Sequence, residues 1–170
     1  MFEISKATFS DVDTICKLGA QTFTEAYAAF NTEADLEDYT SRYFSKEKIE
    51  EELKSAKTGY YLCFHGPKAI GYLKLNFNIP CEAFASEKAT ELQRIYVLKE
   101  YYRQKAGHAL MHHAFELSKE FSSEYLWLGV WKENHRALKF YTSCGFETIG
   151  ERTFRLGTKI YEDYYLRKRV

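Results

Sequence analysis

The chain has 170 residues, with 24 basic and 24 acidic side chains and a formal net charge of zero. This length is typical of one domain, which we expect to span residues 1–170, and the balanced charge argues against a nucleic-acid partner. The sequence starts without the basic and apolar segments of a secretory signal, and no apolar run approaches the roughly 20 residues that span a bilayer, so we expect a cytoplasmic protein with no membrane partner.

The first predicted elements are a short strand at residues 3–5 and a long helix after it. Ser10 and Asp13 resemble a capping box, in which side chains bond to free backbone N–H groups at the start of a helix. Apolar residues then recur at three- and four-residue steps, which favours a helix ending near Phe30: Val12, Ile15, Gly19, Phe23 and Ala26.

Two short polar helices and a β-hairpin are predicted next. Thr32 and Ser45 are candidate N-cap residues for the helices, because their hydroxyls can accept from first-turn N–H groups. The segments 58–66 and 68–78 have strand character and meet at a Gly-Pro turn. They are therefore expected to pair as a hairpin.

The rest of the chain alternates between strands and helices. It contains a loop at 78–89, a strand at 91–97, a helix from Ala106, a strand at 124–131, a helix at 133–146 with Gly145 as its C-terminal stop, and strands at 147–150 and 159–166. Strand, helix and strand in succession imply a right-handed parallel crossover, whereas hairpins imply antiparallel pairs. We predict a single-domain α/β fold: a mixed, mostly antiparallel sheet with a central parallel β-α-β crossover and helices on both faces.

Cysteine and aromatic content adds two expectations. The four cysteines, Cys16, Cys63, Cys81 and Cys144, form no CxxC pair, so we expect reduced thiols, with Cys63 and Cys16 in the core. Aromatic residues make up 17% of the chain, an unusually large share. They fit a core built from rings or, as an alternative, a ligand cleft lined by some of them.

The segment YYRQKAGHALMHH, residues 101–113, joins the strand at 91–97 to the next helix. The first N–H groups of a helix lack intrahelical partners and lie at the positive end of its dipole, so this junction suits a pyrophosphate. Arg103 and Lys105 add positive charge. A helix that simply begins with charged residues explains the same pattern, so both interpretations stay open at this point.

Several motifs follow one another in register. They are RIYV at 94–97, the loop ending at Gly107, WLGVW at 127–131, and NHRALKFY at 134–141 with CGF after it. This order resembles the GNAT superfamily of acetyl-CoA-dependent N-acetyltransferases, and most closely the bacterial spermidine/spermine N-acetyltransferase group. The resemblance is strongest over residues 91–150 and implies an acyltransferase with acetyl-CoA as co-substrate.

The resemblance implies a pyrophosphate loop with the pattern Gln or Arg, two variable residues, Gly, one variable residue, and Gly or Ala. The pattern falls on Tyr102, Arg103, Gln104, Lys105, Ala106 and Gly107, and His108 follows near the phosphate. Tyr102 and Lys105 depart from it, whereas Gly107 is retained. Such a loop binds mainly through backbone N–H groups, so we expect it to work, with Lys105 costing on the order of 1 kcal/mol if its φ is positive.

The resemblance also implies how the pantetheine arm is bound. The strand end would pair with it through backbone groups, provided that a gap lies between Val97 and Gly129. Asn134 matches a cofactor-contacting asparagine, although without the resemblance it is a plain helix N-terminal residue. The candidates are Ile95, Tyr96 and Val97 on the strand, and Asn134, Ala137 and Phe140 on the helix.

Two side chains match catalytic positions of the resembling family. Tyr141 would protonate the departing CoA thiolate as general acid, and Glu91 would act as general base toward an ammonium whose pKa is about 10. As isolated residues, Tyr141 would be a core aromatic and Glu91 a solvated carboxylate. The family's amine attacks acetyl-CoA directly, so no nucleophile is needed and Cys144 is a bystander.

A metal site is not predicted. His108 and His112 are four residues apart on one helix, with His113 adjacent, which is a spacing that zinc ligands use. However, the sequence offers no third ligand at a convincing spacing. We therefore expect no metal, and His108 is interpreted as a neighbour of the phosphate.

The acceptor amine is predicted from one acidic segment. Four carboxylates within six residues border the expected acceptor region and would attract a polycation such as spermidine or spermine: Glu33, Asp35, Glu37 and Asp38. The alternative is a solvated helix start, where acidic residues favour the helix dipole.

Two other functions stay open, together with the oligomeric state. The chain could acetylate an amine on a protein or an aminoglycoside, or it could be a non-catalytic acetyl-CoA sensor, because its loop departs from the family pattern. Aromatic residues of the last strands, Tyr161, Tyr164 and Tyr165, could form a homodimer surface.

Overall fold

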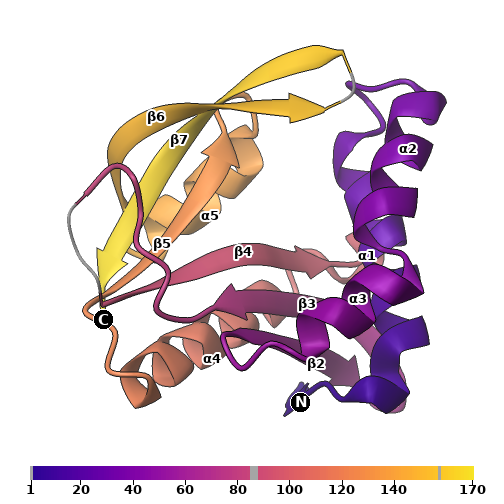
Figure 1. Cartoon of the computed structure of the whole chain (residues 1–170), viewed down its shortest axis with the longest axis horizontal. Helices are drawn as coiled ribbons and strands as arrows, with labels where there is room; N and C mark the ends of the chain where they lie inside the picture. The colour runs from indigo at the N-terminus through magenta and orange to yellow at the C-terminus, as the bar shows by residue number, and fades with distance from the viewer. Residues whose placement is uncertain (1, 85–87, 157) are drawn as a thin grey trace. The chain divides into compact units, whose positions relative to one another are not determined.

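The structure is a computed structural model that describes residues 2–84, 88–156 and 158–170. Figure 1 shows its elements in chain order: β1 (Glu3–Lys6), η1 (Phe9–Asp11), α1 (Val12–Tyr27), α2 (Glu33–Tyr43), α3 (Lys46–Leu53), β2 (Thr58–His65), β3 (Lys68–Asn76), β4 (Ala89–Val97), η2 (Lys99–Tyr101), α4 (Ala106–Glu120), β5 (Tyr125–Trp131), α5 (His135–Ser143), β6 (Glu147–Leu156) and β7 (Lys159–Arg169).

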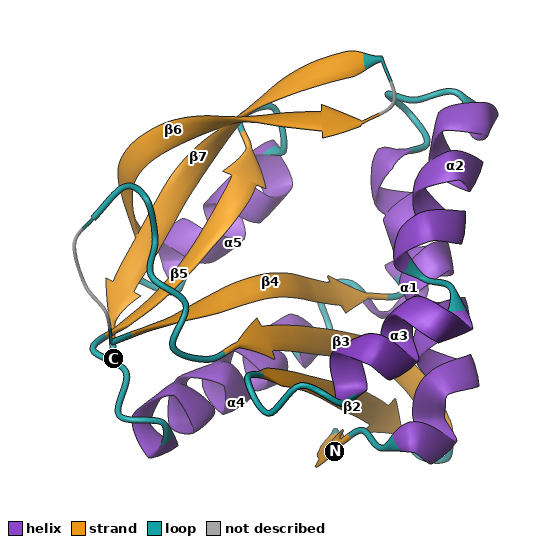
Figure 2. Ribbon diagram, in the orientation of Figure 1, coloured by secondary structure: helices purple, strands orange, loops and turns teal. Residues whose placement is uncertain are grey.

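The strands form one sheet in the order β1-β2-β3-β4-β5-β7-β6. β4 and β5 are parallel, with Glu91 opposite Trp127, and α4 makes the crossover between them (Figure 2). β5 pairs antiparallel with β7, and β7 with β6. The predicted α/β class, with a mixed, mostly antiparallel sheet and one parallel crossover, is confirmed.

The chain forms two compact units, which are described separately below. The first contains Met1–Lys74 and Arg94–His113, and the second contains Leu75–Gln93 and Ala114–Val170. β4 and α4 each continue from one unit into the other. A single domain over residues 1–170 stays a prediction.

The start of α1 differs from its prediction. The Thr8 N–H donates to Asp11 Oδ2 at 2.8 Å, at a short 3₁₀ turn that precedes the helix. Asp13 instead pairs with Lys46 at 2.7 Å. The predicted capping box at Ser10 and Asp13 is therefore wrong, because the 3₁₀ turn moves the carboxylate–backbone bond toward the N-terminus.

The caps of the next two helices match their predictions. The Thr32 hydroxyl accepts from the Asp35 N–H, and the Ser45 hydroxyl accepts from the Lys48 N–H, each at 3.2 Å. Each bond satisfies one of the N–H groups that a helix start leaves free. The local sequence therefore fixes where α2 and α3 begin.

Several boundaries lie elsewhere than predicted. β6 and β7 continue to Leu156 and Arg169, because the two strands support each other as a long antiparallel pair. α5 is shorter than the segment 133–146, since Asn134 and Gly145 close its two ends. α1 ends at Tyr27, three residues before Phe30.

The predicted loop at 78–89 belongs to the second unit, and its described residues, 78–84 and 88–89, pack within that unit. Residues 85–87 lie outside the described part of the chain. The Trp127 indole N–H donates to the Ile79 carbonyl at 2.9 Å. Cys81 is buried with Trp127 and Tyr165.

Cys63 is buried as predicted, but Cys16 is half-exposed, so its predicted place in the core is wrong.

Candidate active site

The connection from β4 to α4 lies in the first unit and is held by specific bonds. The Leu98 N–H donates to the Ile70 carbonyl at 2.8 Å, which continues the association of β4 with β3. The Lys99 N–H donates to Glu25 Oε2 on α1 at 2.9 Å. These bonds fix the chain just before the expected pyrophosphate loop.

Two residues of this loop adopt left-handed backbone conformations. Arg103 has φ 66° and Lys105 has φ 67°. This conformation is uncommon for a residue with a Cβ, and the Lys105 position is the one where the family pattern has its first glycine. The conformational cost that the sequence analysis assigned to Lys105 in the case of a positive φ therefore applies.

The start of α4 then directs N–H groups out of the helix. The Lys105 carbonyl accepts from the Ala109 N–H at 3.0 Å, and the N–H groups of Ala106 and Gly107 lie in the first turn, before this intrahelical bond. Ala106 is buried, Gly107 is half-buried and His108 is exposed. A short half-buried turn with free N–H groups has the chemistry that an anion requires.

The side chains of the loop cannot close this helix start themselves. Arg103 and Lys105 are exposed and carry only hydrogen-bond donors, so they cannot accept from the N–H groups of α4. The Gln104 amide points back and donates to the Glu100 carbonyl at 3.0 Å. The loop therefore combines free N–H groups with two cations, which fits the pyrophosphate of acetyl-CoA.

The end of β4 carries the predicted pantetheine contacts. Ile95, Tyr96 and Val97 are half-buried. On the β3 side, a Cβ on Gly71 would lie 2.7 Å from the Tyr96 carbonyl oxygen, so only glycine allows this close approach of the two strands. Val97 belongs to the first unit and Gly129 to the second, so the gap between them stays a prediction.

Asn134, in the second unit, caps α5. Its Oδ1 accepts from the Ala137 N–H at 3.1 Å, and its own N–H donates to the Trp131 carbonyl at 3.0 Å. The interpretation of Asn134 as a helix N-terminal residue therefore has direct support. Its Nδ2 group makes no hydrogen bond with the described residues, which leaves two donors for a ligand.

Tyr141 occupies the C-terminal turn of the same helix. The Phe146 N–H donates to the Tyr141 carbonyl at 3.1 Å and the Gly145 N–H to the Thr142 carbonyl at 2.9 Å, with Gly145 at φ 85°. This pattern is a Schellman motif, so the prediction of Gly145 as the helix stop is confirmed. The Tyr141 ring is buried and lies edge-on to Phe146, with centroids 5.8 Å apart.

Glu91 is held by a residue that the sequence did not indicate. Asn76 Nδ2 on β3 donates to Glu91 Oε2 at 2.7 Å, and Glu91 is half-buried within β4. The interpretation of Glu91 as a fully solvated strand-end carboxylate is therefore wrong. The amide donor fixes the orientation of the Glu91 carboxylate, as a residue that transfers a proton requires.

Gly129 on β5 leaves room for another unpredicted group. A Cβ at this position would lie 2.1 Å from the guanidinium of Arg152, whose Nε donates to Asp163 Oδ2 at 3.3 Å. Asp163 is buried, and burial raises the pKa of its carboxyl group, against the opposite effect of Arg152. The side chain of Arg152 thus covers Gly129 on this face of the sheet.

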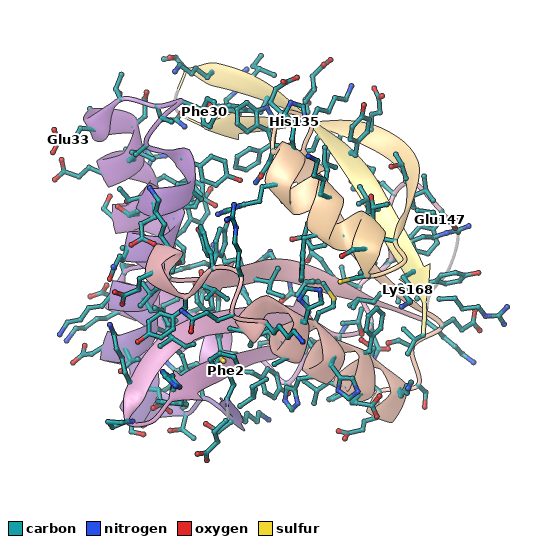
Figure 3. All side chains as sticks on the ribbon, turned by 180° about the vertical axis from the view of Figure 1, so that it is seen from behind. Phe2, Phe30, Glu33, His135, Glu147 and Lys168 are labelled. Carbon is teal, nitrogen blue, oxygen red and sulfur yellow. The ribbon has the colours of Figure 1, made fainter. Side chains whose placement is uncertain are left out.

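The acidic segment of α2 is committed in part to the helix itself. Asp35 Oδ2 accepts from the Thr32 hydroxyl at 2.8 Å, and Asp38 pairs with Arg42 at 2.7 Å. Glu33 is exposed, and its side chain points away from the ribbon (Figure 3). These contacts are those of a solvated helix start.

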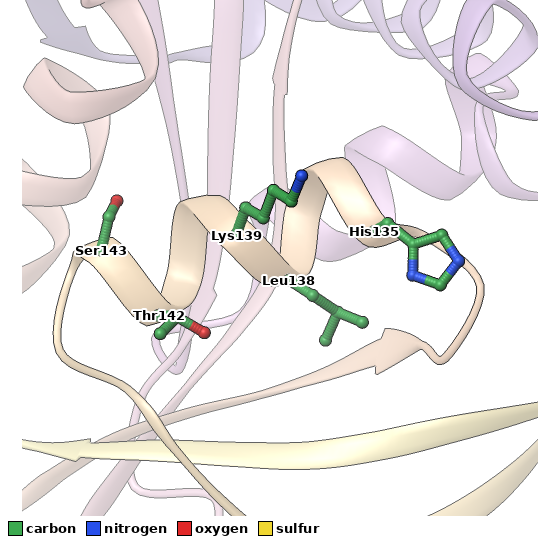
Figure 4. A pocket seen from close by; sticks show the side chains of 5 residues that line it. All are labelled: His135, Leu138, Lys139, Thr142 and Ser143. Atoms are coloured by element: carbon green, nitrogen blue, oxygen red, sulfur yellow. The ribbon is translucent and has the colours of Figure 1, made fainter.

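A surface depression on α5 contains none of the predicted site residues. It is open and is lined by side chains of a single helix (Figure 4): His135, Leu138, Lys139, Thr142 and Ser143.

Among the residues that the structure describes, no three His, Cys, Asp or Glu side chains are placed to hold a metal ion. In the same part of the chain, no helix is long and apolar enough to cross a membrane.

Sequence reasoning missed a buried polar cluster in the first unit. Arg94, the first residue of RIYV, is buried on β4; its Nη1 donates to the Tyr60 hydroxyl at 3.3 Å, and its guanidinium lies 4.6 Å from the centre of the Phe44 ring. The Tyr60 hydroxyl donates to Glu52, which also pairs with buried Lys74 at 2.7 Å. The sequence did contain one sign of this cluster: Arg94 is a basic residue in a strand segment whose next residues, Ile95, Tyr96 and Val97, are apolar or aromatic.

Comparison with solved structures identifies the fold to which this arrangement belongs. The PaiA N-acetyltransferase of Thermoplasma acidophilum, solved in complex with coenzyme A, superposes with a TM-score of 0.80, covering 100% of this chain and 99% of that one at 22% identity. This likeness shows an N-acetyltransferase fold.

The sequence then gives the family. The chain belongs to the acetyltransferase (GNAT) family, whose model matches residues 21–146. It is therefore an N-acetyltransferase, and acetyl-CoA is the acetyl donor of this family. The predicted membership of the GNAT superfamily is confirmed.

Two relatives cover most of the chain. An uncharacterized N-acetyltransferase of Lactobacillus delbrueckii subsp. lactis is 26% identical over 166 residues, which is 98% of this chain and 96% of the relative. A spermidine N(1)-acetyltransferase of Thermoplasma acidophilum is 27% identical over 149 residues, which is 85% of this chain and 88% of the relative.

Proposed function

We propose that this N-acetyltransferase moves an acetyl group from acetyl-CoA to a small primary amine, which attacks the thioester directly in a ternary complex. The observation that carries the proposal is the left-handed turn at Arg103 and Lys105, which leads into the first-turn N–H groups of Ala106 and Gly107 in α4. Within a GNAT chain, this is the position at which a pyrophosphate is expected.

The loop would hold the pyrophosphate through both backbone and charge. The N–H groups at the start of α4 supply donors and the positive end of the helix dipole. Arg103 and Lys105 lie beside them as exposed cations. The residues proposed for this role are Tyr102, Arg103, Gln104, Lys105, Ala106, Gly107 and His108.

The pantetheine arm would lie along the end of β4. Ile95, Tyr96 and Val97 would offer backbone groups to it in the manner of an added strand. From α5, Asn134 would contribute its two Nδ2 donors, since its Oδ1 is already used by the helix cap. Ala137 and Phe140 would flank the arm.

The chemical step needs proton transfers that two side chains can provide. The Tyr141 hydroxyl would donate its proton to the sulfur as the thioester bond breaks. Glu91, oriented by Asn76, would remove a proton from the bound ammonium, directly or through water, and the free amine would then attack the thioester carbonyl. No covalent bond to Cys144 is required.

A polyamine such as spermidine or spermine is the first candidate acceptor. It is supported by the relative from Thermoplasma acidophilum that is named a spermidine N(1)-acetyltransferase. The acidic segment of α2 adds less support, because Asp35 and Asp38 have partners within the helix. The buried charge of Arg94 favours a different acceptor.

Two broader alternatives remain as proposals, together with the setting of the enzyme. A protein or aminoglycoside amine would need a wider acceptor site, and a sensor would bind acetyl-CoA without turnover. A cytoplasmic location and a homodimer formed through Tyr161, Tyr164 and Tyr165 stay predictions from the sequence.

One assay tests the proposed function. Thiol release from acetyl-CoA is measured with polyamines, diamines, monoamines, aminoglycosides and peptides, while CoA binding is measured separately by calorimetry. Turnover of any small amine supports the enzyme as proposed. Binding of CoA with no turnover of any compound would favour the sensor instead.

A further inference from the structure

Arg94 is a buried cation without an anionic partner. It is 8% exposed, and it forms no ion pair within 4.0 Å across residues 2–84, 88–156 and 158–170. A buried charge is costly unless it is paired, and a guanidinium has five N–H donors to satisfy. A partner is therefore missing from this site.

The neighbouring carboxylate does not fill that place. Glu52 accepts from the Tyr60 hydroxyl and pairs with Lys74 at 2.7 Å. Both charges of that ion pair are buried or nearly so, with side-chain exposures of 4% for Lys74 and 14% for Glu52. Glu52 also favours the positive charge of Arg94, but it is shared with Lys74, so Arg94 has no carboxylate partner of its own among the described residues.

Tyrosine side chains surround the guanidinium without neutralising it. Burial raises the pKa of Tyr39, Tyr60 and Tyr72, so their phenols stay protonated at neutral pH. None of the three can act as an anion, and the Tyr60 hydroxyl already donates to Glu52. Phe44 covers one face of the guanidinium, which leaves its N–H edge to bind in the plane.

The Tyr72 hydroxyl is the second sign of a missing ligand. It is fully buried, and it makes no hydrogen bond of normal geometry with the described residues. Thr22 lies near it, but the Thr22 hydroxyl donates to the Leu18 carbonyl at 2.7 Å. An unsatisfied buried hydroxyl costs about 1–3 kcal/mol, so its retention needs a reason.

We propose that Arg94, with the hydroxyl of Tyr72, forms a subsite for a carboxylate group on the acceptor. A guanidinium binds a carboxylate through two parallel hydrogen bonds, and the Tyr72 phenol adds a donor to the same oxygens. The acceptor is then an amine that carries a carboxylate several carbons from its nitrogen. This inference rests on the proposed acetyltransferase function.

The position of Arg94 along β4 makes such an acceptor geometrically reasonable. Arg94 precedes Val97 by three residues, which is about 10 Å at the rise of a β-strand. Ile95, Tyr96 and Val97 are the proposed pantetheine contacts on the same strand. A short aliphatic chain could therefore join an amine near the thioester to a carboxylate at Arg94.

This subsite and the polyamine candidate predict opposite preferences. A polycation would place a second ammonium near the guanidinium, and like charges in a buried site repel each other. A carboxylate there would instead neutralise Arg94. The comparison is sharpest between acceptors of one length that differ only in their far end.

The test uses a matched series of linear amines with two to six methylenes and a terminal carboxylate, methyl or ammonium group. Thiol release is measured at saturating acetyl-CoA with the full chain. We expect kcat/KM for one carboxylate compound to exceed that of the methyl and ammonium compounds of equal length by about 10-fold to 100-fold. Faster turnover of the ammonium series would overturn the subsite and support a polyamine.

Variants then assign the preference to the cluster. In Arg94→Gln, the ratio of carboxylate to methyl rates should fall to near one. Tyr72→Phe keeps the buried ring and removes only the unsatisfied hydroxyl, so it should fold normally and reduce the same ratio by about 5-fold. Tyr61→Phe, a buried tyrosine on β2 that contacts His113, is the matched control and should not change the ratio.

A binding measurement separates this inference from the proposed function. The Arg94 Nε–Hε signal, assigned by its loss in Arg94→Gln, is followed by NMR while butanoate is added to the CoA-bound protein. A saturable shift would support the subsite even if no amine were acetylated. An unmoved signal, or a carboxylate preference that survives Arg94→Gln, would show that Arg94 has a purely structural role.

Discussion

Helices α4 and α5 follow the two parallel strands, yet they begin in opposite ways. α5 is closed at both ends by its own sequence, with the Asn134 side chain at its start and a Schellman motif at Gly145. α4 begins after the left-handed residue Lys105, whose side chain has no acceptor atom to offer the helix.

This difference separates two ways in which a helix can serve a cofactor site. A closed helix such as α5 is stable without a ligand and can present side chains, among them Tyr141, in fixed positions. An open helix start such as that of α4 leaves backbone donors for an anion. We therefore expect changes in α5 to affect turnover and changes at the α4 start to affect CoA binding.

The largest effect is expected for Tyr141→Phe. The ring contact with Phe146 is kept, so the helix end should remain intact. Loss of a general acid costs about 100-fold or more in turnover. Steady-state kinetics and calorimetry with CoA check this: kcat should fall while the Kd for CoA changes little.

Tyr125→Phe on β5 is the control for this substitution and should leave kcat unaffected. An unchanged kcat in Tyr141→Phe would rule out the general-acid role. A large loss of CoA affinity in the same variant would instead show that α5 contributes to binding, contrary to the division between the two helices.

The next effect is expected for Gly107→Glu at the α4 start. A carboxylate in the first turn favours the helix dipole, so the protein should not lose stability, but it repels the pyrophosphate. We expect a 10-fold to 100-fold weaker Kd for CoA, on the order of 1–3 kcal/mol. Gly107→Gln has the same size without the charge and should be clearly milder.

Equal effects of Glu and Gln at position 107 would mean that bulk, and not charge, limits binding there. No effect of either would place the pyrophosphate away from α4. Thermal unfolding of both variants shows whether the helix itself has been disturbed.

The two helices also show how far the sequence could predict this enzyme. Gly145, Thr32 and Ser45 were correctly predicted as helix ends, because caps depend on a few neighbouring residues. The parallel pairing of β4 with β5 followed from the succession of strand, helix and strand along the sequence. Local signals of this kind need no knowledge of distant contacts.

The Arg94 cluster could not be predicted in the same way. Its members come from α2, α3 and three different strands, and their contacts arise only when those elements pack. The predicted capping box at Ser10 and Asp13 was wrong because a 3₁₀ turn precedes α1, and within this turn the carboxylate of Asp11 accepts from the Thr8 N–H. Asn76 beside Glu91 likewise depends on the approach of β3 to β4.

A smaller effect is expected at the start of α5. Asn134→Ala removes the cap and should lower the free energy of unfolding by about 1 kcal/mol. Asn134→Ser keeps a capping oxygen but removes the Nδ2 donors. Chemical denaturation should therefore separate the two variants, whereas calorimetry should show weaker CoA binding in both if Nδ2 contacts the cofactor. Unchanged binding in both would leave Asn134 as a cap alone.

The smallest net effect is expected for Lys105→Gly, because two opposing terms change together. Glycine removes the cost of the left-handed conformation, about 1 kcal/mol, so the free energy of unfolding should rise. It also removes an ammonium beside the proposed pyrophosphate, which should weaken CoA binding by a similar amount. The apparent affinity can then change by less than about 5-fold.

Lys105→Ala separates these terms, since alanine keeps the conformational cost but not the charge. If the ammonium contacts the pyrophosphate, both variants should show weaker CoA binding and a reduced dependence of Kd on salt, and only glycine should raise stability. If it does not, alanine should leave the Kd unchanged and glycine should improve it through a better-formed loop. Weaker CoA binding in both variants would show that the charge of Lys105 compensates for its strained backbone conformation. An unchanged Kd with alanine and a better Kd with glycine would show that Lys105 only weakens the CoA-binding loop at the start of α4.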